Sequence, residues 1–234
     1  MVVVPGEAYA EEVVAHKDSL LLVPEHWDFL KAAAFPEAFM TAFDALWRQC
    51  DVQSHHRVLI HAVTSGVGDA ARQLCEYFGN EVWGSTRTDA KVDYISQTVC
   101  QPVLIQNGLF PSDLPQFDAI LDLVGAAYLT QNIQHLAYRG TIHVIGLMGG
   151  IQSTIGLHHL LKNNGRIQAS TLRNRPNDEK AEICRLLDDS IRDALSSGHI
   201  EPTVDAIYSW HDVELAHQKM AKNQHIGKIV LEVD

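Results

Sequence analysis

The sequence predicts an α/β fold with a doubly wound parallel sheet. In the middle of the chain, short apolar runs typical of buried strands alternate with amphipathic segments typical of helices. The connections between them are short, and glycines follow several of the runs. Alternation of this kind is characteristic of parallel strands covered by helices on both faces of the sheet.

Six apolar runs are expected to form the strands of this sheet, namely 57–62, 81–86, 102–106, 117–125, 141–147 and 166–172. The segments expected to form helices between them are 66–79, 90–99, 127–140 and 156–165. Gly79 and Gly140 are expected to end the first and third of these helices, because glycine readily takes the left-handed backbone of a helix end. A short helix before Pro36 and a longer one over 37–50 are expected ahead of the first strand.

Both ends of the chain depart from this alternation. Residues 7–24 alternate apolar and polar side chains, which predicts two short strands. Near the other end, an amphipathic helix over 178–198 precedes strands over 204–210 and 226–233, with a helix over 211–223 between them. The two ends are therefore expected to form a second, smaller β substructure.

Charge and composition exclude several kinds of partner. The formal net charge is −11, whereas a protein that binds nucleic acid needs a basic face, so no nucleic-acid partner is expected. No apolar run is long enough to cross a membrane and no signal sequence opens the chain, which predicts a cytoplasmic protein without a membrane partner. The four cysteines are widely spaced, which predicts reduced thiols and no metal site.

The turn after the first expected strand has the form of a nucleotide-binding loop. Gly66 and Gly68 allow a tight turn, and the helix that follows offers N–H groups and a partial positive charge to a pyrophosphate. Ser65 adds a hydroxyl group. Val63 and Ser65 stand where glycine is common, so a purely structural turn is the alternative interpretation.

The end of the second expected strand selects the cofactor. An NAD site usually has an acidic residue there, which bonds to the ribose hydroxyls. This chain instead has Arg87 and Lys91, which together with the hydroxyls of Ser85, Thr86 and Thr88 could hold the 2′-phosphate of NADPH. Asp89 follows the strand end by several residues and is expected to face solvent. A surface Arg87 without a ligand is the alternative.

The fifth expected strand ends in a glycine-rich exit. Gly146, Leu147 and Met148 form a segment at which a flat ring could approach the backbone closely. A simple left-handed turn would have the same sequence, and it remains the structural alternative.

Several stretches together resemble the medium-chain dehydrogenase/reductases of the zinc-free quinone oxidoreductase group, and most of all its p53-inducible quinone oxidoreductase-like members. The resemblance follows the order of the family through "AYAEEVVAHKDSLLLVPE", "AAAFPEAFMTAFDAL", "VLIHAVTSGVGDAARQL", "FDAILDLVGAAYL", "GTIHVIGLMGG", "STLRNR" and "HIGKIVLEV". It covers nearly the whole chain. It implies a Rossmann domain that binds NADPH, a partial GroES-like β substructure from both chain ends, and a homodimer formed through the edge of the nucleotide domain.

The resemblance also assigns cofactor-binding residues. Contacts with the nicotinamide, the pyrophosphate and the 2′-phosphate are implied for Thr41, Ser65, Gly66, Val67 and Lys91. The other implied neighbours of the cofactor are Gly146, Leu147, Met148, Leu172 and Asn223. Arg87 departs from the glycine that is usual in quinone reductases, and this departure supports NADPH. No single catalytic residue is expected, because the cofactor itself carries the hydride.

The resemblance implies three parts: a remnant of the GroES-like catalytic domain over 1–36, the NADPH-binding domain over 37–175, and a helix and strands that return to the catalytic domain over 176–234. Most of the GroES-like domain, which forms one wall of the family's substrate cleft, is expected to be absent. The expected activity is zinc-independent reduction of quinones or related conjugated carbonyls by NADPH. The alternatives are a non-catalytic NADPH-binding dimer that has lost its substrate domain, and a structural dimer whose glycine turn binds nothing.

Overall fold

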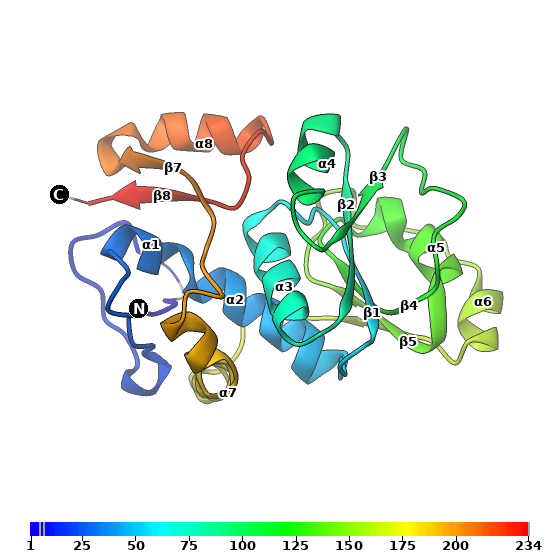
Figure 1. Cartoon of the computed structure of the whole chain (residues 1–234), viewed down its shortest axis with the longest axis horizontal. Helices are drawn as coiled ribbons and strands as arrows, with labels where there is room; N and C mark the ends of the chain where they lie inside the picture. Colours follow the sequence, from blue (N-terminus) through cyan, green and yellow to red (C-terminus); the bar gives the residue numbers. More distant parts are fainter. Residues whose placement is uncertain (5, 7, 234) are drawn as a thin grey trace. The chain divides into compact units, whose positions relative to one another are not determined.

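The structure of the chain is a computed structural model, and it describes residues 1–4, 6 and 8–233 (Figure 1). The chain divides into two compact units. The terminal unit consists of Met1–Phe43, Ser65–Ala70 and Thr171–Asp234, and the sheet unit consists of the remaining segments, Asp44–Thr64 and Ala71–Ser170. The division into parts over 1–36, 37–175 and 176–234 stays a prediction.

The sheet unit contains a six-stranded sheet in the order β3-β2-β1-β4-β5-β6, and every neighbouring pair is parallel. The strands are β1 (Arg57–Ile60), β2 (Glu81–Thr86), β3 (Gln101–Leu104), β4 (Phe117–Asp122), β5 (Leu136–Val144) and β6 (Arg166–Ala169). The helices that follow β1, β2, β4 and β5 are α3 (Gly66–Tyr77), α4 (Asp89–Ile95), α5 (Ala126–Gln134) and α6 (Leu157–Lys162). This order is that of a doubly wound fold, and it confirms the predicted fold class.

The core of the sheet unit forms where the apolar runs of the strands meet the helices. Leu59 of β1 and Ile120 of β4 are fully buried in one cluster with Tyr128 and Ile133 of α5. Burial of one such aliphatic side chain stabilises a fold by about 1.5–3 kcal/mol. Because a parallel sheet is covered on both faces, neighbouring residues of a central strand can be buried together, as Val58, Leu59 and Ile60 of β1 are.

The predicted helix over 127–140 is too long. Helix α5 ends at Gln134, and β5 begins at Leu136, so that Gly140 lies inside the strand. A Cβ atom added at Gly140 would lie 2.9 Å from the carbonyl oxygen of Phe117, which explains the glycine as a close approach between strands and not as a helix end. The pairing of β4 with β5 shifts its register at this point.

The helix predicted over 37–50 has two parts. It is an α-helix over Pro36–Phe43 (α2) and a π-helix over Asp44–Gln49, where the i→i+5 hydrogen bonds widen the turn. The short helix before it is α1 (Phe29–Ala34), and the carboxylate of Asp28 accepts the backbone N–H of Lys31 at 2.7 Å as its N-cap.

The terminal unit also holds α7 (Asn177–Ser196), β7 (Val204–Ser209), α8 (Val213–Ala221) and β8 (Lys228–Glu232). Strands β7 and β8 pair in parallel as a two-stranded sheet. The two helices and the two strands predicted near the C-terminus are therefore confirmed. Figure 1 shows α8 connecting the two strands above them.

The two strands predicted over 7–24 are not found in the described residues 8–24, whose one regular element is the 3₁₀ turn Lys17–Ser19. A strand needs a neighbour that shares its ladder of hydrogen bonds. In this segment Leu21 exchanges one pair of bonds with Met1: its N–H donates to the carbonyl oxygen of Met1 at 2.9 Å, and the terminal amine of Met1 donates to the carbonyl oxygen of Leu21 at 2.7 Å. This pair does not extend into a ladder, and the alternation of side chains carries no information on how long such a pairing is. Glu7, at which the first expected strand begins, lies outside the described residues.

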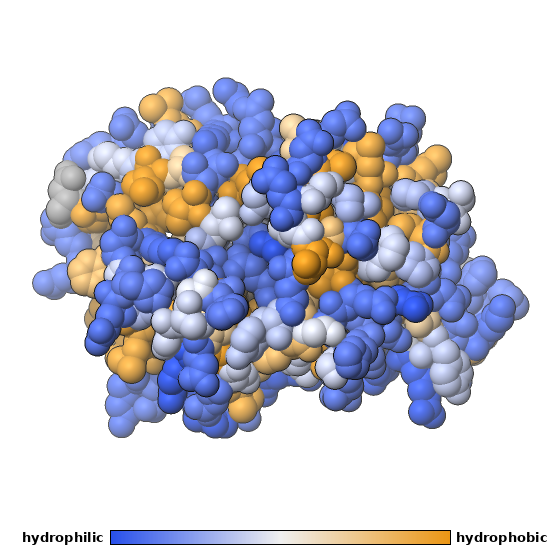
Figure 2. Space-filling view, in the orientation of Figure 1, coloured by the Kyte–Doolittle hydropathy of each residue, from blue (hydrophilic) through white to orange (hydrophobic). Residues whose placement is uncertain are grey.

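Polar side chains cover most of the face that Figure 2 shows, with apolar ones in smaller groups. Within the described part of the chain, every helix is too short or too polar to span a bilayer.

Candidate functional site

The turn between β1 and α3 begins in the sheet unit with an unusual backbone. Ala62 has a φ of 48°, in the left-handed region that favours glycine. The next residue, Val63, is buried. A Cβ atom added at Gly84 of β2 would lie 2.6 Å from the Cγ1 of Val63. Val63 therefore fills a space that Gly84 leaves open. The valine that stands in a usual glycine position packs into the core, and the left-handed turn falls on Ala62.

The first turn of α3 lies in the terminal unit, with the predicted residues Ser65, Gly66 and Val67. The Oγ of Ser65 accepts the backbone N–H of Gly68 at 3.1 Å, so Ser65 caps the helix and keeps its own O–H as a donor. A Cβ atom added at Gly66 would lie 2.3 Å from the Cδ of Lys228. The stem of Lys228 therefore passes close over Gly66 at the start of the helix, and a larger residue there would displace that stem.

Lys228 connects this turn with α2. Its Nζ donates to Oε2 of Glu37 at 3.0 Å, and the hydroxyl of Thr41 lies 3.5 Å from Oε1 of the same carboxylate. An isolated β-bridge joins Ser65 to Gly227, the residue before Lys228. The terminal unit therefore brings the predicted residues Thr41, Ser65 and Gly66 into one neighbourhood.

Two other predicted residues of the terminal unit have different surroundings. Leu172 is buried. Asn223 is exposed, and its φ of 53° and the bond from its N–H to the carbonyl oxygen of Met220, at 2.9 Å, mark it as the residue that ends α8. Their cofactor contacts stay predictions.

The carboxyl end of β2 carries the predicted cations of the sheet unit. The strand ends at Thr86, Arg87 follows as an exposed residue, and Lys91 lies in the first turn of α4, where its N–H donates to the carbonyl oxygen of Thr88 at 3.2 Å. Asp89 is exposed, as expected. The strand therefore ends in the hydroxyl of Thr86 and the guanidinium of Arg87. An NAD site usually has an acidic residue at this place, which binds the ribose hydroxyls.

The electrostatic field of Arg87 reaches Tyr128 of α5. Burial raises the pKa of the Tyr128 phenol, and the positive charge of Arg87 opposes this rise. Tyr128 was not among the predicted site residues.

The exit of β5 is attached to the exit of β4. The N–H groups of Ile145 and Gly146 donate to the carbonyl oxygen of Asp122 at 2.8 and 3.4 Å. A Cβ atom added at Gly146 would lie 2.5 Å from the carbonyl oxygen of Leu123. The next two residues, Leu147 and Met148, are 55% and 73% exposed. This exit is therefore a fixed backbone segment with apolar side chains that reach into solvent.

A buried group of polar side chains lies behind these strand ends, and sequence reasoning did not find it. His61 bonds through Nδ1 to Oγ of Ser85 at 2.8 Å, and through Nε2 to Oδ1 of Asn132 at 2.7 Å. The Nδ2 of Asn132 donates to Oδ2 of Asp122 at 2.9 Å. All four residues are buried. The hydroxyl of Ser85 therefore faces the interior.

No set of three or more His, Cys, Asp or Glu side chains in the described part of the chain is arranged to hold a metal ion. All four cysteines are buried thiols outside disulfides. Burial raises the pKa of Cys50 to about 12 and that of Cys184 to about 11, so that both are protonated near neutral pH and are poor metal ligands.

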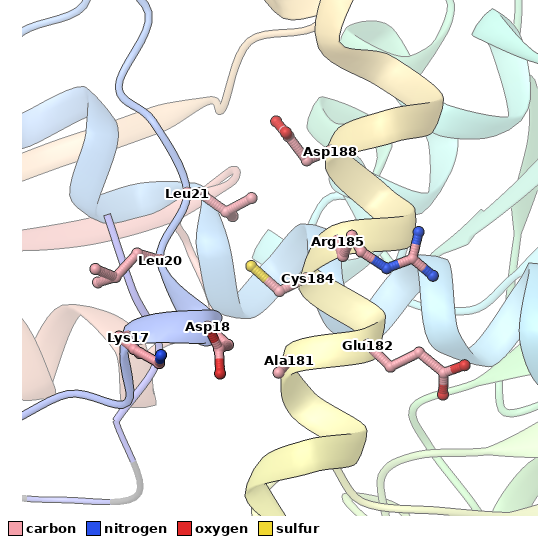
Figure 3. A pocket seen from close by; sticks show the side chains of 9 residues that line it. All are labelled: Lys17, Asp18, Leu20, Leu21, Ala181, Glu182, Cys184, Arg185 and Asp188. Atoms are coloured by element: carbon pink, nitrogen blue, oxygen red, sulfur yellow. The ribbon is translucent and has the colours of Figure 1, made fainter.

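A cavity of about 430 Å³ in the terminal unit lies between the segment that carries Leu21 and helix α7 (Figure 3). Figure 3 shows the Cys184 thiol pointing from α7 toward Leu20 and Leu21, with Asp18 below it. None of the predicted site residues lines this cavity.

A parallel sheet in this strand order, with a glycine-containing turn after its first strand, defines a Rossmann-type α/β fold. Residues 88–231 match the family of zinc-binding dehydrogenases, and the chain belongs to that family.

Two curated proteins and one solved structure illustrate the relationship. The chain is 29% identical over 230 residues to the highly reducing polyketide synthase azaB of Aspergillus niger, with 92% of the chain and 9% of the synthase covered. It is 23% identical to the quinone oxidoreductase of Sus scrofa, with 95% of the chain and 68% of that enzyme covered. The crystal structure of an NAD-dependent alcohol dehydrogenase matches with a TM-score of 0.84 at 25% identity and covers 97% of the chain and 65% of that protein.

The chain therefore spans a small part of the polyketide synthases that it matches and about two thirds of the dehydrogenase and quinone oxidoreductase.

Proposed function

We propose that the chain is the cofactor-binding part of an NADPH-dependent oxidoreductase that reduces quinones or related conjugated carbonyls. The observation that carries the choice of cofactor is the end of β2, where Arg87 and Lys91 stand and no carboxylate ends the strand. A guanidinium can donate two hydrogen bonds to a phosphate, and an ammonium adds a point charge. Membership of the dehydrogenase family and the likeness to a quinone oxidoreductase support the reaction class.

We assign the predicted residues to three parts of the cofactor. The backbone N–H groups of Gly66 and Val67 and the hydroxyl of Ser65 would hold the pyrophosphate, because they lie at the start of a helix whose dipole favours an anion. Arg87 and Lys91 would hold the 2′-phosphate. Thr41 and Leu172 are proposed to lie near the nicotinamide. The other proposed neighbours of the cofactor are Gly146, Leu147, Met148 and Asn223.

NADPH, when bound, supplies a hydride, and with one proton from solvent a quinone becomes a hydroquinone while NADPH becomes NADP⁺. The residues of the chain orient the reactants and exclude water, and we propose no single catalytic residue among them.

We further propose the zinc-independent quinone oxidoreductase group, with its p53-inducible members, as the subgroup of this chain. A homodimer through the edge of the nucleotide domain, the three-part division at residues 36 and 175, and a location in the cytoplasm belong to the same proposal. The sheet has two edge strands, β3 and β6, and such pairing would use one of them.

A titration with NADPH and NADH in parallel, followed by nicotinamide fluorescence, tests the cofactor assignment. The substitutions Arg87→Ala and Lys91→Ala should each weaken NADPH binding roughly tenfold or more, because a charge-assisted hydrogen bond contributes about 1.5–3 kcal/mol. Binding of NADH should change little. Lys162→Ala, which removes an exposed cation at the end of α6, is the matched control and should leave both affinities unchanged.

Equal affinity for both nucleotides in the wild-type protein, or binding of NADH alone, would refute the NADPH assignment. Binding of neither would favour the structural alternative, in which the glycine turn holds no ligand.

A second candidate reaction is reduction of a conjugated thioester on a growing acyl chain. The observation that favours it is the 29% identity to a highly reducing polyketide synthase, which exceeds the 23% identity to the quinone oxidoreductase. Consumption of NADPH with a simple benzoquinone and with a crotonyl thioester, measured side by side, distinguishes the two substrates. Tight NADPH binding without turnover of either would favour the non-catalytic dimer.

A further inference from the structure

The buried polar group of the sheet unit arises from the register of three strands. Ile60 of β1 pairs with Gly84 of β2 and with Leu121 of β4. The next residue along each chain is therefore at one level, and these residues are His61, Ser85 and Asp122. Residues two positions earlier, such as Leu59 and Ile120, belong to the apolar cluster under α5. Since side chains alternate along a strand, the three polar groups continue the same face and meet Asn132 of α5.

The hydrogen bonds of this group have one direction. The carboxylate of Asp122 can only accept, so the side chain of Asn132 gives it an N–H and turns Oδ1 toward His61. An amide oxygen can only accept, so Nε2 of His61 must carry a proton. In the neutral ring Nδ1 is then an acceptor, and it takes the O–H of Ser85. The chain of donors therefore runs from Ser85 through His61 and Asn132 to Asp122; we name these four residues the relay.

The relay connects two segments that the proposed function assigns to the cofactor. At one end, Ser85 lies two residues before Arg87, and its carbonyl oxygen accepts the N–H of Val63 from the glycine turn at 3.2 Å. At the other end, Oδ1 of Asp122 accepts the N–H groups of Val124 and Gly125 at 2.7 and 2.8 Å. The carbonyl oxygen of Asp122 accepts hydrogen bonds from the backbone N–H groups of Ile145 and Gly146. A single buried network thus holds the residues at the carboxyl ends of β2, β4 and β5 in place.

We propose that His61, in its neutral form with the proton on Nε2, is a positioning residue for nucleotide binding, because it fixes the end of β2 that carries Arg87 relative to the exits of β4 and β5. This inference rests on the proposed function. His61 itself is fully buried and makes both of its ring contacts inside the protein, so it acts through Ser85 and Asp122 and not by touching the ligand.

The surroundings of His61 keep it neutral. Burial lowers its pKa, while the nearby Asp122 carboxylate and the bond to Asn132 act in the opposite direction. The other groups that face the ring are Tyr128 of α5, at 4.9 Å between ring centres, and Phe110, at 5.3 Å. Arg87 acts on Tyr128, and His135 lies 5.9 Å from the Phe110 ring. A second proton on His61 would force Nδ1 to donate, and the O–H of Ser85 could no longer point at it.

The first experiment is nitrogen-15 NMR of the histidine rings in the full chain, with His61 assigned by loss of its signal in His61→Gln. The Nε2–H tautomer is expected at pH 7, and it should persist below about pH 6.5, the ordinary pKa of a histidine side chain. A cationic ring or an Nδ1–H tautomer at pH 7 would overturn the relay, and this readout does not depend on nucleotide binding.

The second experiment measures nucleotide affinity after Ser85→Ala, which removes the first donor and leaves the other three residues in place. Loss of one neutral hydrogen bond corresponds to roughly a three- to tenfold change in an equilibrium constant, and we expect NADPH and NADH to be weakened alike by this factor. The matched control is Thr141→Val. Thr141 is buried in β5, and its hydroxyl has no hydrogen-bond partner among the described residues, so this change should leave both affinities unchanged.

A third measurement follows NADH affinity against pH, because NADH lacks the 2′-phosphate that would itself titrate. The affinity should fall in acid along the same curve as the His61 NMR signal. The positioning role would be overturned if Ser85→Ala bound both nucleotides as tightly as the wild-type protein. It would also be overturned if the affinity for NADH did not change when His61 is protonated. If the wild-type protein binds neither nucleotide, the proposed function fails, whereas the NMR result still decides the relay.

Discussion

Gly146→Ala is the most specific test of how the β5 exit is built. The added Cβ atom would lie 2.5 Å from the carbonyl oxygen of Leu123 and 3.0 Å from its carbonyl carbon, and both belong to backbone that cannot rotate away. To restore a contact of ordinary length, the exit must move by roughly 1 Å, which would break the bonds from Ile145 and Gly146 to the carbonyl oxygen of Asp122. At about 1 kcal/mol for each bond, we expect a loss of about 1–3 kcal/mol in the free energy of unfolding.

Urea denaturation followed by circular dichroism measures this loss, and NADPH titration of the folded variant measures its effect on the proposed site. Gly156→Ala is the matched control. Gly156 precedes α6 with a φ of −84°, and its added Cβ would meet nothing within 4 Å, so its stability should change by less than about 0.5 kcal/mol. Equal stability of the two variants would refute the argument that the exit of β5 needs a glycine at position 146.

Three further predictions follow from the backbone and from His61. Gly227→Ala should destabilise the terminal unit by about 3 kcal/mol or more in urea denaturation, because φ is +81° and the Cβ would lie 2.2 Å from the carbonyl oxygen of Thr203. Ala62→Gly should raise the urea midpoint by an amount that corresponds to about 1 kcal/mol, since it relieves the left-handed φ of 48°, and a lower midpoint would contradict this. Because burial lowers the pKa of His61, the unfolded chain takes up its proton first, and this contribution to stability is present above about pH 6.5 and is lost as the pH falls below it, by at most about 1.4 kcal/mol for each pH unit. The pH dependence of unfolding between pH 7.5 and 5.5 should therefore be shallower in His61→Phe than in the wild-type protein, and equal slopes would argue against a neutral His61.

The sequence predicted the sheet well because each strand is a compact apolar run. In β1 the run from Val58 to Ile60 is fully buried, and such runs indicate strands without knowledge of their neighbours. The glycine turn could be located for a similar reason, since Gly66 and Gly68 are close together in the chain. Gly140 was misinterpreted, because a glycine at a helix end and a glycine at a close contact between strands look the same in a sequence.

The remaining features depend on contacts between distant segments. Val63 fills the space above Gly84, and only the parallel register of β1 and β2 reveals that the two residues belong together. The relay was missed for the same reason. His61, Ser85 and Asp122 are polar residues near the carboxyl ends of three strands, which is a signal in the sequence, but it becomes meaningful only after the strands are aligned. The alternation over residues 7–24 led to the prediction of strands that the described residues do not form. Alternation describes which way side chains face, and it does not show whether a partner strand is present.

The turn after β4 has a consequence for the motions of the sheet unit. Loop amides generally exchange their hydrogens with solvent quickly, because local opening costs little free energy. The amides of Val124 and Gly125 instead donate to a carboxylate that is fully buried and that is itself held by Asn132. These amides can exchange only when the structure opens locally so far that the carboxylate of Asp122 also becomes exposed to solvent. We therefore expect these two turn amides to exchange as slowly as the central strands β1 and β4, and to mark the slowest-opening part of the sheet's carboxyl edge.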